Sequence, residues 1–160
     1  THCLSSAASD VYKRQAPIKL EVDWSAKKIK DVIEDIKSNV NIDENRIYLT
    51  GLSMGGRGTF IVASELPDYF AAIMPLSPHH QPYSYVPLAE SISHIPIWMS
   101  HGNIDYVSSY GLALEMFNAL TSFGANVIFR TEYDIGHWGW EDIYSDSLVM
   151  NWLLSIEKAQ

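Results

Sequence analysis

The chain has 160 residues, 47% of them apolar and 12% aromatic, so it can bury one hydrophobic core and is not a disordered sequence. Its formal net charge of −8 argues against nucleic acid and anionic membranes as partners, because both bind surfaces rich in Lys and Arg. No apolar run approaches the roughly 20 residues of a membrane-spanning helix, and a single cysteine, Cys3, excludes an intrachain disulfide.

The segment 1–15 differs from the rest of the chain. It has neither a helical nor a strand period, and it lacks the apolar stretch of a signal peptide. We interpret it as a non-native cloning scar or a disordered tail and leave it out of the fold. On that interpretation native upstream sequence is missing, and the cellular compartment is undetermined.

From residue 16 onward, helical and strand-like patterns alternate. Helix signals occur near 26–40, 55–65, 110–120 and 148–156. Short β-prone or buried runs indicate strands at 46–50, 70–76, 95–100 and 126–131. The proline-rich segment 77–87 is expected to be a loop over a surface or a site. This alternation predicts an α/β fold, a parallel sheet with helices on both faces, in one domain spanning 16–160.

Gly51-Leu52-Ser53-Met54-Gly55 is a G-x-S-x-G sequence between a predicted strand and a predicted helix. In that setting the serine occupies a sharp turn with its hydroxyl above the sheet. Glycines at both ends prevent collisions with the neighbouring strand and helix. The next helix directs its N-terminus at the site, so the N–H of Met54 can donate to an oxyanion. The alternative is a glycine-rich turn without catalytic meaning, which the flanking strand and helix disfavour.

A serine hydroxyl needs a base to remove its proton, and His137 is the best placed of the six histidines. It lies in a glycine-flanked loop after the last predicted strand, at the sheet edge where catalytic groups gather. His79 and His80, in the proline-rich loop, are candidates for contact with substrate, although a solvated loop position is the commoner role. His101, at the end of a strand, is interpreted as a structural hydrogen-bonding residue rather than the base.

Asp105 is the predicted acidic partner of His137. It follows the strand at 95–100, so Ser53, Asp105 and His137 each follow a different strand and face the same edge of the sheet. The base needs such a partner to fix its tautomer and to stabilise the imidazolium. Asp134 is the rival for this role, but its closeness to His137 in the sequence indicates that it shapes the turn.

Residues 41–157 resemble the esterase and peptidase branch of the α/β hydrolases, which includes polyhydroxybutyrate-depolymerase-like and feruloyl-esterase-like proteins. The resemblance rests on segments 43–56, 95–98 with His101-Gly102 and Asp105, Gly136-His137, and 144–154. It implies an α/β-hydrolase fold whose N-terminal strands are missing here. Ser53, Asp105 and His137 take the nucleophile, acid and base positions. Met54 supplies one oxyanion donor, and an upstream loop supplies the second.

The leading hypothesis is hydrolysis of a carboxylic ester through an acyl-enzyme on Ser53, without metal or organic cofactor. The expected substrate is a small-molecule or carbohydrate-linked ester. Four aromatic residues near the expected site would suit an aryl or sugar group, or belong to the core: Tyr83, Tyr85, Trp138 and Trp140. A serine peptidase on the same triad is one alternative. An inactive fragment, or a binding domain that keeps the fold, is the other.

Overall fold

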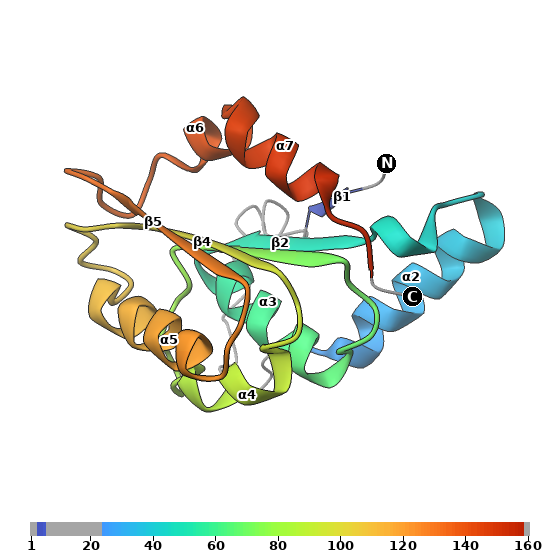
Figure 1. Ribbon diagram of the computed structural model, residues 1–160, viewed down its shortest axis with the longest axis horizontal. Helices are drawn as coiled ribbons and strands as arrows, with labels where there is room; N and C mark the ends of the chain where they lie inside the picture. Colours follow the sequence, from blue (N-terminus) through green and yellow to red (C-terminus); the bar gives the residue numbers. More distant parts are fainter. Residues whose placement is uncertain (1–2, 6–23, 159–160) are drawn as a thin grey trace, which may run out of the picture.

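The computed structural model describes residues 3–5 and 24–158. Within these residues five parallel strands form one sheet (Figure 1). The strands are Cys3–Ser5 (β1), Tyr48–Leu52 (β2), Ala72–Leu76 (β3), Ile97–Gly102 (β4) and Val127–Glu132 (β5). The α-helices are Ala26–Asn39 (α2), Met54–Glu65 (α3), Ala89–Ile92 (α4), Tyr110–Ser122 (α5), Trp140–Ser145 (α6) and Ser147–Ser155 (α7). Two short 3₁₀ helices are Glu44–Arg46 (η1) and Val86–Leu88 (η2).

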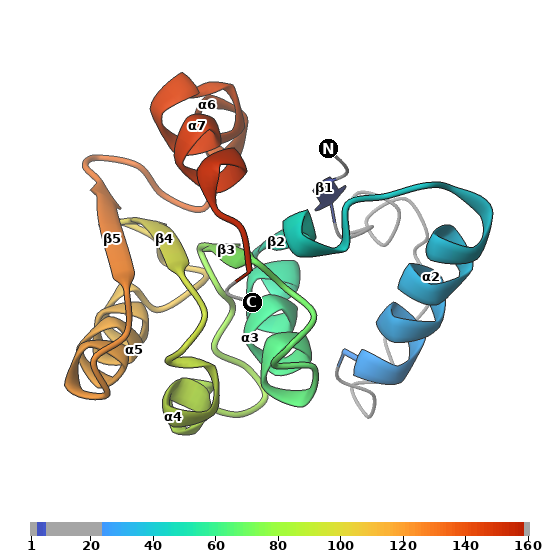
Figure 2. The same cartoon turned by 45° about the vertical axis from the view of Figure 1, so that its right-hand side comes forward.

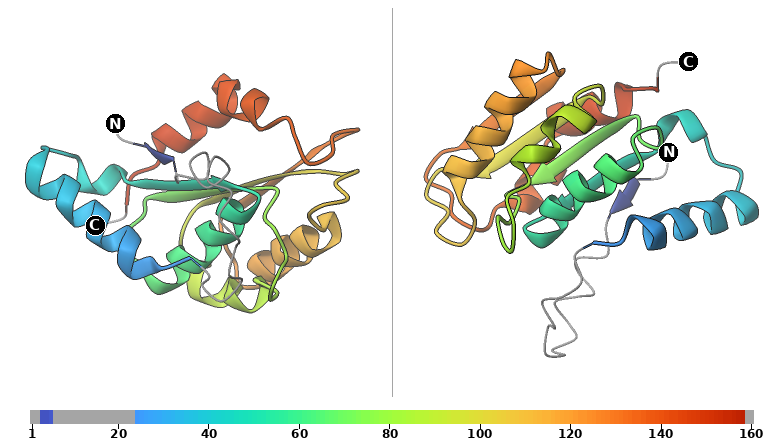
Figure 3. Two further views of the ribbon diagram at one scale, coloured as in Figure 1. Left: turned by 180° about the vertical axis from the view of Figure 1, so that it is seen from behind. Right: turned by 90° about the horizontal axis from the view of Figure 1, so that it is seen from below.

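The strands follow one another across the sheet in chain order, β1-β2-β3-β4-β5. Because crossovers between parallel strands are right-handed and this order never reverses, the connecting helices lie on one face. That face carries α3, α4 and α5, with α2 beside α3, and α6 and α7 cover the other face (Figure 2). Figure 3 shows the first layer lying over the strands in the view from below. The predicted parallel sheet with helices on both faces is confirmed.

Alternate residues of the central strands enter two apolar layers. Ile73 and Ile97 pack in the cluster that includes side chains of α2, α3 and α5. Met74 and Trp98, one residue further along each strand, pack in the opposite cluster with Val149 of α7. Because both faces are covered, β3 and residues 97–99 of β4 are continuous apolar runs rather than alternating ones.

Two helices begin close to the predicted positions. Ser25 caps α2, where its side chain accepts a hydrogen bond from the amide of Lys28. The next helix, α3, begins at Met54, one residue before its predicted start at residue 55. Ser53 therefore immediately precedes the helix, with no intervening loop residue.

Two predicted strand ends were wrong. The strand predicted to stop at Gly51 continues through it to Leu52, because Gly51 still pairs with Pro75 of β3. The strand predicted at 95–100 extends as β4 to Gly102, and its added residues, His101 and Gly102, pair with β5. This extension places His101 and Gly102 inside the sheet, beyond the predicted end of the strand.

Beyond α3, three short helices were not predicted. The segment 77–87 is a loop only until η2, which leads directly into α4. The third, α6, precedes the closing helix α7. Helices of three, four and six residues complete at most two turns, so they leave no hydrophobic period in the sequence.

The strand β1 lies within the segment 1–15, which we interpreted as non-native or disordered. Cys3–Ser5 pairs in parallel with Tyr48–Thr50 of β2. The pairing does not reveal the origin of the segment, so that interpretation stays a prediction. The rest of it, and residues 16–23, lie outside the described residues. In the described part of the chain, every helix is too short or insufficiently apolar to cross a membrane.

Candidate active site

Ser53 occupies the sharp turn between β2 and α3. Its backbone has φ 54° and ψ −114°, in a region that residues other than glycine rarely adopt. The Ser53 amide donates to the carbonyl of Leu76, and the Ser53 carbonyl accepts from the amide of His79, both at 2.9 Å. Both partners belong to β3 or the loop just after it, so the neighbouring strand holds the strained turn in place.

Glycine permits this turn because the backbone of α3 passes very close to β2. A Cβ on Gly51 would lie 2.3 Å from the carbonyl oxygen of Gly55, a distance that no side chain tolerates. This contact joins the two glycines of the G-x-S-x-G sequence, as predicted from sterics. Gly56, to which no role was assigned, is similarly constrained, because its Cβ would lie 2.6 Å from the carbonyl oxygen of Leu76.

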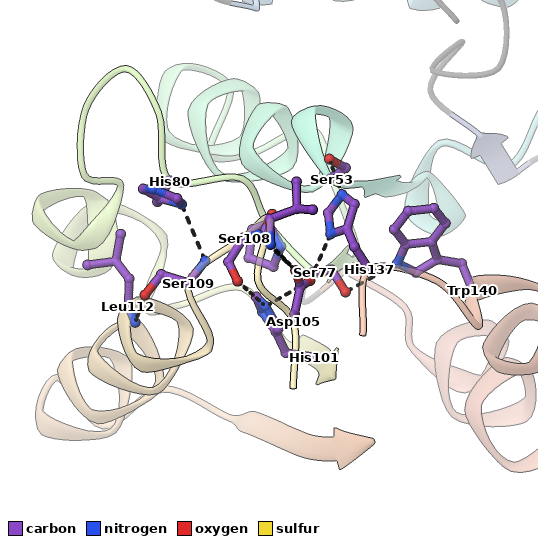
Figure 4. Close-up of polar contacts among 12 residues, drawn as sticks. Ser53, Ser77, His80, His101, Asp105, Ser108, Ser109, Leu112, His137 and Trp140 are labelled. Carbon is purple, nitrogen blue, oxygen red and sulfur yellow. Dashed lines mark hydrogen bonds and ion pairs between the residues drawn. The ribbon is translucent and has the colours of Figure 1, made fainter. Parts of the chain in front are cut away.

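Ser53, His137 and Asp105 form one chain of hydrogen bonds (Figure 4). His137 Nε2 lies 2.8 Å from Ser53 Oγ, and His137 Nδ1 lies 2.7 Å from Asp105 Oδ2. The three residues follow β2, β5 and β4, whose carboxyl ends meet at one edge of the sheet. The structure thus brings together the three residues singled out in the sequence, and their catalytic roles stay predictions.

The carboxylate of Asp105 is fully buried and hydrogen-bonded at both oxygens. Oδ1 accepts from the amides of Val107 and Ser108, each at 2.8 Å. Burial raises the pKa of Asp105, but the Ser108 amide, His137 and the Val107 amide outweigh it, so the pKa lies below its usual value. The ionised carboxylate can accept Nδ1–H from His137, which leaves Nε2 as the proton acceptor facing Ser53.

A second imidazole, His101, lies beside the same carboxylate. His101 is completely buried in β4, and its Nε2 lies 3.4 Å from Asp105 Oδ2 and 3.3 Å from the carbonyl oxygen of Ser108. Burial lowers the pKa of His101, and it outweighs Asp105 and the Ser108 carbonyl, which raise it. Sequence reasoning missed the contact with Asp105. The available signal was the spacing of four residues from a strand end, which fits many turns.

Trp140 packs against the other side of the base. Its ring meets the His137 ring nearly at right angles, at 88°, with centroids 5.0 Å apart. The indole N–H donates to Ser77 Oγ at 3.2 Å. Ser77 also has a positive φ, 41°, and its amide donates to the carbonyl of Ser100 in β4. Trp140, at the start of α6, is therefore anchored to the sheet edge, and no role had been assigned to Ser77.

The two histidines of the proline-rich loop stack on each other near the serine turn. The His79 and His80 rings are 5.1 Å apart and inclined by 19°. Nδ1 of His79 accepts the amide of Gln81, and Nδ1 of His80 accepts the amide of Ser109. Burial lowers the pKa of His79. Their predicted contact with substrate stays a prediction.

The four candidate aromatic residues divide by burial. Tyr85 is buried and packs on Phe60 at 4.9 Å, so it belongs to the core rather than to a substrate site. Tyr83 and Trp138 are 74% and 57% exposed, and a role for Trp138 in substrate contact stays a prediction. Only Trp140 touches a member of the hydrogen-bonded chain among the contacts described above.

The rival acid and the proposed oxyanion donor occupy different positions. Asp134 is exposed at φ 58°, and its amide donates to Asn103 Oδ1, whereas His137 bonds Asp105. Met54 is the first residue of α3, so its N–H has no acceptor within the helix and lies directly after Ser53. Among the residues described, no three His, Cys, Asp or Glu side chains are grouped to hold a metal ion.

Residues 10–147 match the model of a family described as Phospholipase/Carboxylesterase. The chain belongs to this family. The structure of a thermostable esterase, which is 30% identical in sequence, is similar to it with a TM-score of 0.75. That similarity covers 82% of this chain and 36% of the esterase. The expected membership of the α/β-hydrolase esterase branch is thereby confirmed.

Two curated relatives match shorter parts of this chain. Poly(3-hydroxyalkanoate) depolymerase C of Paucimonas lemoignei is 41% identical over 49 residues, which are 31% of this chain and 12% of that protein. The bifunctional acetylxylan esterase/xylanase XynS20E of Neocallimastix patriciarum is 32% identical over 82 residues, 51% of this chain and 12% of that protein. The chain thus spans a small part of these curated relatives.

Proposed function

We propose that this chain hydrolyses carboxylic esters through an acyl-enzyme, with Ser53 as nucleophile, His137 as base and Asp105 as the supporting acid. The observation that carries the proposal is the unbroken pair of short hydrogen bonds, 2.8 Å from His137 to Ser53 and 2.7 Å from His137 to Asp105. Family membership supports the same chemistry. So does the strained backbone of Ser53, which is the expected conformation of a serine presented above a sheet edge.

In the first half-reaction, Ser53 Oγ attacks the ester carbonyl carbon while His137 Nε2 takes the hydroxyl proton. The carbonyl oxygen becomes an oxyanion, to which the N–H of Met54 donates at the positive end of α3. Asp105 stabilises the imidazolium. His137 then gives its proton to the departing alkoxide, the carbon–oxygen bond breaks, and the alcohol leaves the acyl group on Ser53.

Water completes the second half-reaction at the same groups. His137 takes a proton from a water molecule, whose oxygen attacks the acyl carbon. The bond to Ser53 Oγ breaks, the carboxylic acid leaves, and Ser53 recovers its proton from His137. One ester and one water are consumed for one acid and one alcohol, so no redox partner or metal is required.

For substrate we propose a small-molecule or carbohydrate-linked ester. The two curated relatives are named for enzymes that act on polyhydroxyalkanoates and acetylxylan, both of which contain ester bonds. The exposed rings of Tyr83 and Trp138 offer flat apolar surfaces on which an aryl or sugar group can stack. An anionic lipid surface is disfavoured by the net charge of −8.

The proposal is tested by comparing three substrates: 4-nitrophenyl acetate, an acetylated xylo-oligosaccharide and an acetyl-amino-acid 4-nitroanilide. The longest form of the protein that carries this chain is used. We expect both esters to be hydrolysed, with a burst of nitrophenol, and the anilide to react far more slowly. Ser53→Ala should abolish the reaction. The matched control is Ser64→Ala in α3, the helix that follows Ser53, where the hydroxyl bonds the carbonyl of Ile61.

Two results would contradict the proposal. Folded protein that hydrolyses neither ester would favour the alternative of a binding domain that keeps the fold. Preference for the anilide over both esters would favour a serine peptidase on the same three residues.

A further inference from the structure

One oxygen of the buried acid faces two imidazole rings. Asp105 Oδ2 lies 2.7 Å from His137 Nδ1 and 3.4 Å from His101 Nε2, whereas Oδ1 is occupied by two backbone amides. Figure 4 shows His101 on the side of the carboxylate opposite Ser53. An ester-hydrolysing triad requires only the first ring, so the second is unexplained by the proposed reaction.

The surroundings of His101 define its protonation. Its Nε2 faces two acceptors, Asp105 Oδ2 and the carbonyl oxygen of Ser108 at 3.3 Å, so the ring proton lies on Nε2 and is shared between them. Nδ1 is buried and has no hydrogen-bond partner in the described part of the chain, which an unprotonated nitrogen tolerates better than an N–H would. The ring meets Tyr110 edge-on at 81°, with centroids 5.9 Å apart, and this contact fixes its orientation.

We propose that His101 is a positioning residue of the active site, whose Nε2–H shares Asp105 Oδ2 with His137 and thereby limits how strongly His137 holds its proton. The inference rests on the proposed function for its role in catalysis, but the sharing itself is a property of the hydrogen bonds. A base that holds its proton less strongly stays unprotonated down to a lower pH, and there it can still accept the hydroxyl proton of Ser53.

The direction of the effect follows from how Asp105 is held. If the donor of His101 were removed, the amides of Val107 and Ser108 would still fix Oδ1 at 2.8 Å, so the carboxylate would stay in place. Oδ2 would then serve His137 alone, and that bond would strengthen. Besides Asp105 and His101, His79 on the loop after β3 also interacts electrostatically with His137.

The test uses a matched pair, His101→Gln and His101→Met. The two new side chains have similar length and volume, but only Gln carries an N–H₂ group that can replace Nε2–H. The first readout is the low-field proton resonance of the His137–Asp105 hydrogen bond in histidine-labelled protein, and it requires no substrate. The second is the acidic limb of the pH profile for kcat/KM with 4-nitrophenyl acetate.

We expect His101→Met to move the resonance downfield and the acidic limb upward by about half a pH unit, because a shared hydrogen bond is worth roughly a threefold change in proton affinity. His101→Gln should restore both toward the parent. Tyr110→Phe, which keeps the ring that faces His101 and removes only the bond to Thr131, should change neither readout.

A folded His101→Met protein with the parent's resonance would overturn the inference. If the Met variant does not fold, His101→Asn replaces it, because the shorter amide cannot reach Oδ2, and its resonance decides in the same way. If the resonance responds as expected but no ester is hydrolysed, the proposed function fails and the sharing of Asp105 stands. If the esters are hydrolysed and the resonance does not respond, the proposed function stands and the sharing of Asp105 fails.

Discussion

The turn that carries Ser53 and the loop that carries His137 are held by different forces. In the serine turn, residues 51–55, backbone lies against backbone, so closely that Gly51 has no room for a Cβ. In the histidine loop, residues 133–139, exposed and half-buried positions predominate, and side-chain hydrogen bonds to Asn103 and Asp105 fix the loop to the end of β4.

This difference explains why the two regions differ in how they appear in the sequence. Steric requirements select glycine at fixed spacing, so the serine turn is visible as a short motif. Hydrogen bonds between distant loops select polar residues without fixed spacing, so the partner of His137 had to be chosen between Asp105 and Asp134. Close backbone packing also occurs at the histidine loop, because a Cβ on Gly102 would lie 2.2 Å from the carbonyl oxygen of Ile135.

The largest effect is expected from breaking the hydrogen bonds of the histidine loop without disturbing its packing. Asp105→Asn should lower kcat by about 10⁴, because an amide stabilises the wrong tautomer of His137 and cannot balance the imidazolium. The matched control is Asp134→Asn, which should retain activity within about twofold, since a surface change of this kind has little effect. Steady-state kinetics with 4-nitrophenyl acetate, alongside circular dichroism, would measure both. A larger loss from Asp134→Asn would assign the acid role to Asp134.

The packing of the serine turn is broken by adding one methyl group. Gly51→Ala should lower the free energy of unfolding by roughly 3 kcal/mol or more, because the new Cβ would meet the backbone of Gly55, which cannot move aside. Gly111→Ala is the matched control. Its Cβ would meet only Ser109 Oγ at 3.8 Å, at an exposed position of α5, and it should stabilise the protein by about 0.5–1 kcal/mol. Urea unfolding of both variants checks this, and equal losses would show that close packing does not hold the turn.

A smaller effect is expected from the indole that packs on the base. Trp140→Phe keeps an aromatic ring against His137 but removes the hydrogen bond to Ser77. We expect kcat to fall by about threefold to tenfold, the value of one neutral hydrogen bond. Trp152→Phe, which changes a ring packed on Trp98 on the sheet face below α7, should lower the melting temperature but not kcat. Equal changes in kcat would show that Trp140 acts only through stability.

The smallest effect is a pH dependence of stability. The pKa of Asp105 is lower in the folded chain than its usual value, so its contribution is present above about pH 4, the unfolded value, and is lost as the pH falls through the folded pKa. Acid unfolding should therefore be steeper below that pH in the parent than in Asp105→Asn. Urea unfolding between neutral pH and strong acid would show this, and parallel curves for the two proteins would contradict it.

Much of the fold followed from local patterns in the sequence. The helix α2, the apolar runs of β3 and β4 and the glycines around Ser53 each depend on residues close together in the chain. The missed features depend on contacts between distant residues or on elements too short to have a period. His101 joins the sheet only because β4 pairs with β5 as far as Gly102. For Tyr85 the sequence left a core position and a substrate contact both open, and the structure places it in the core beside Phe60.

The site divides in the same way. The order of Ser53, Asp105 and His137 along the chain, each after its own strand, was sufficient to place all three at one edge. The residues that surround these three were not predictable. The contact of His101 with Asp105 and the hydrogen bond from Trp140 to Ser77 form only when segments after different strands meet. Substrate contacts at His79, His80 and Trp138 depend on a ligand, and neither the sequence nor the fold determines them.

Labelling with a fluorophosphonate probe, followed by mass spectrometry to locate the modified residue, tests the role of Ser53 most directly. A serine that His137 activates should react rapidly and be labelled only at Ser53. Ser53→Ala should abolish labelling, while the distant Ser64→Ala should not change it. Folded protein that stays unlabelled, or that is labelled equally after Ser53→Ala, would contradict the assignment of Ser53 as nucleophile.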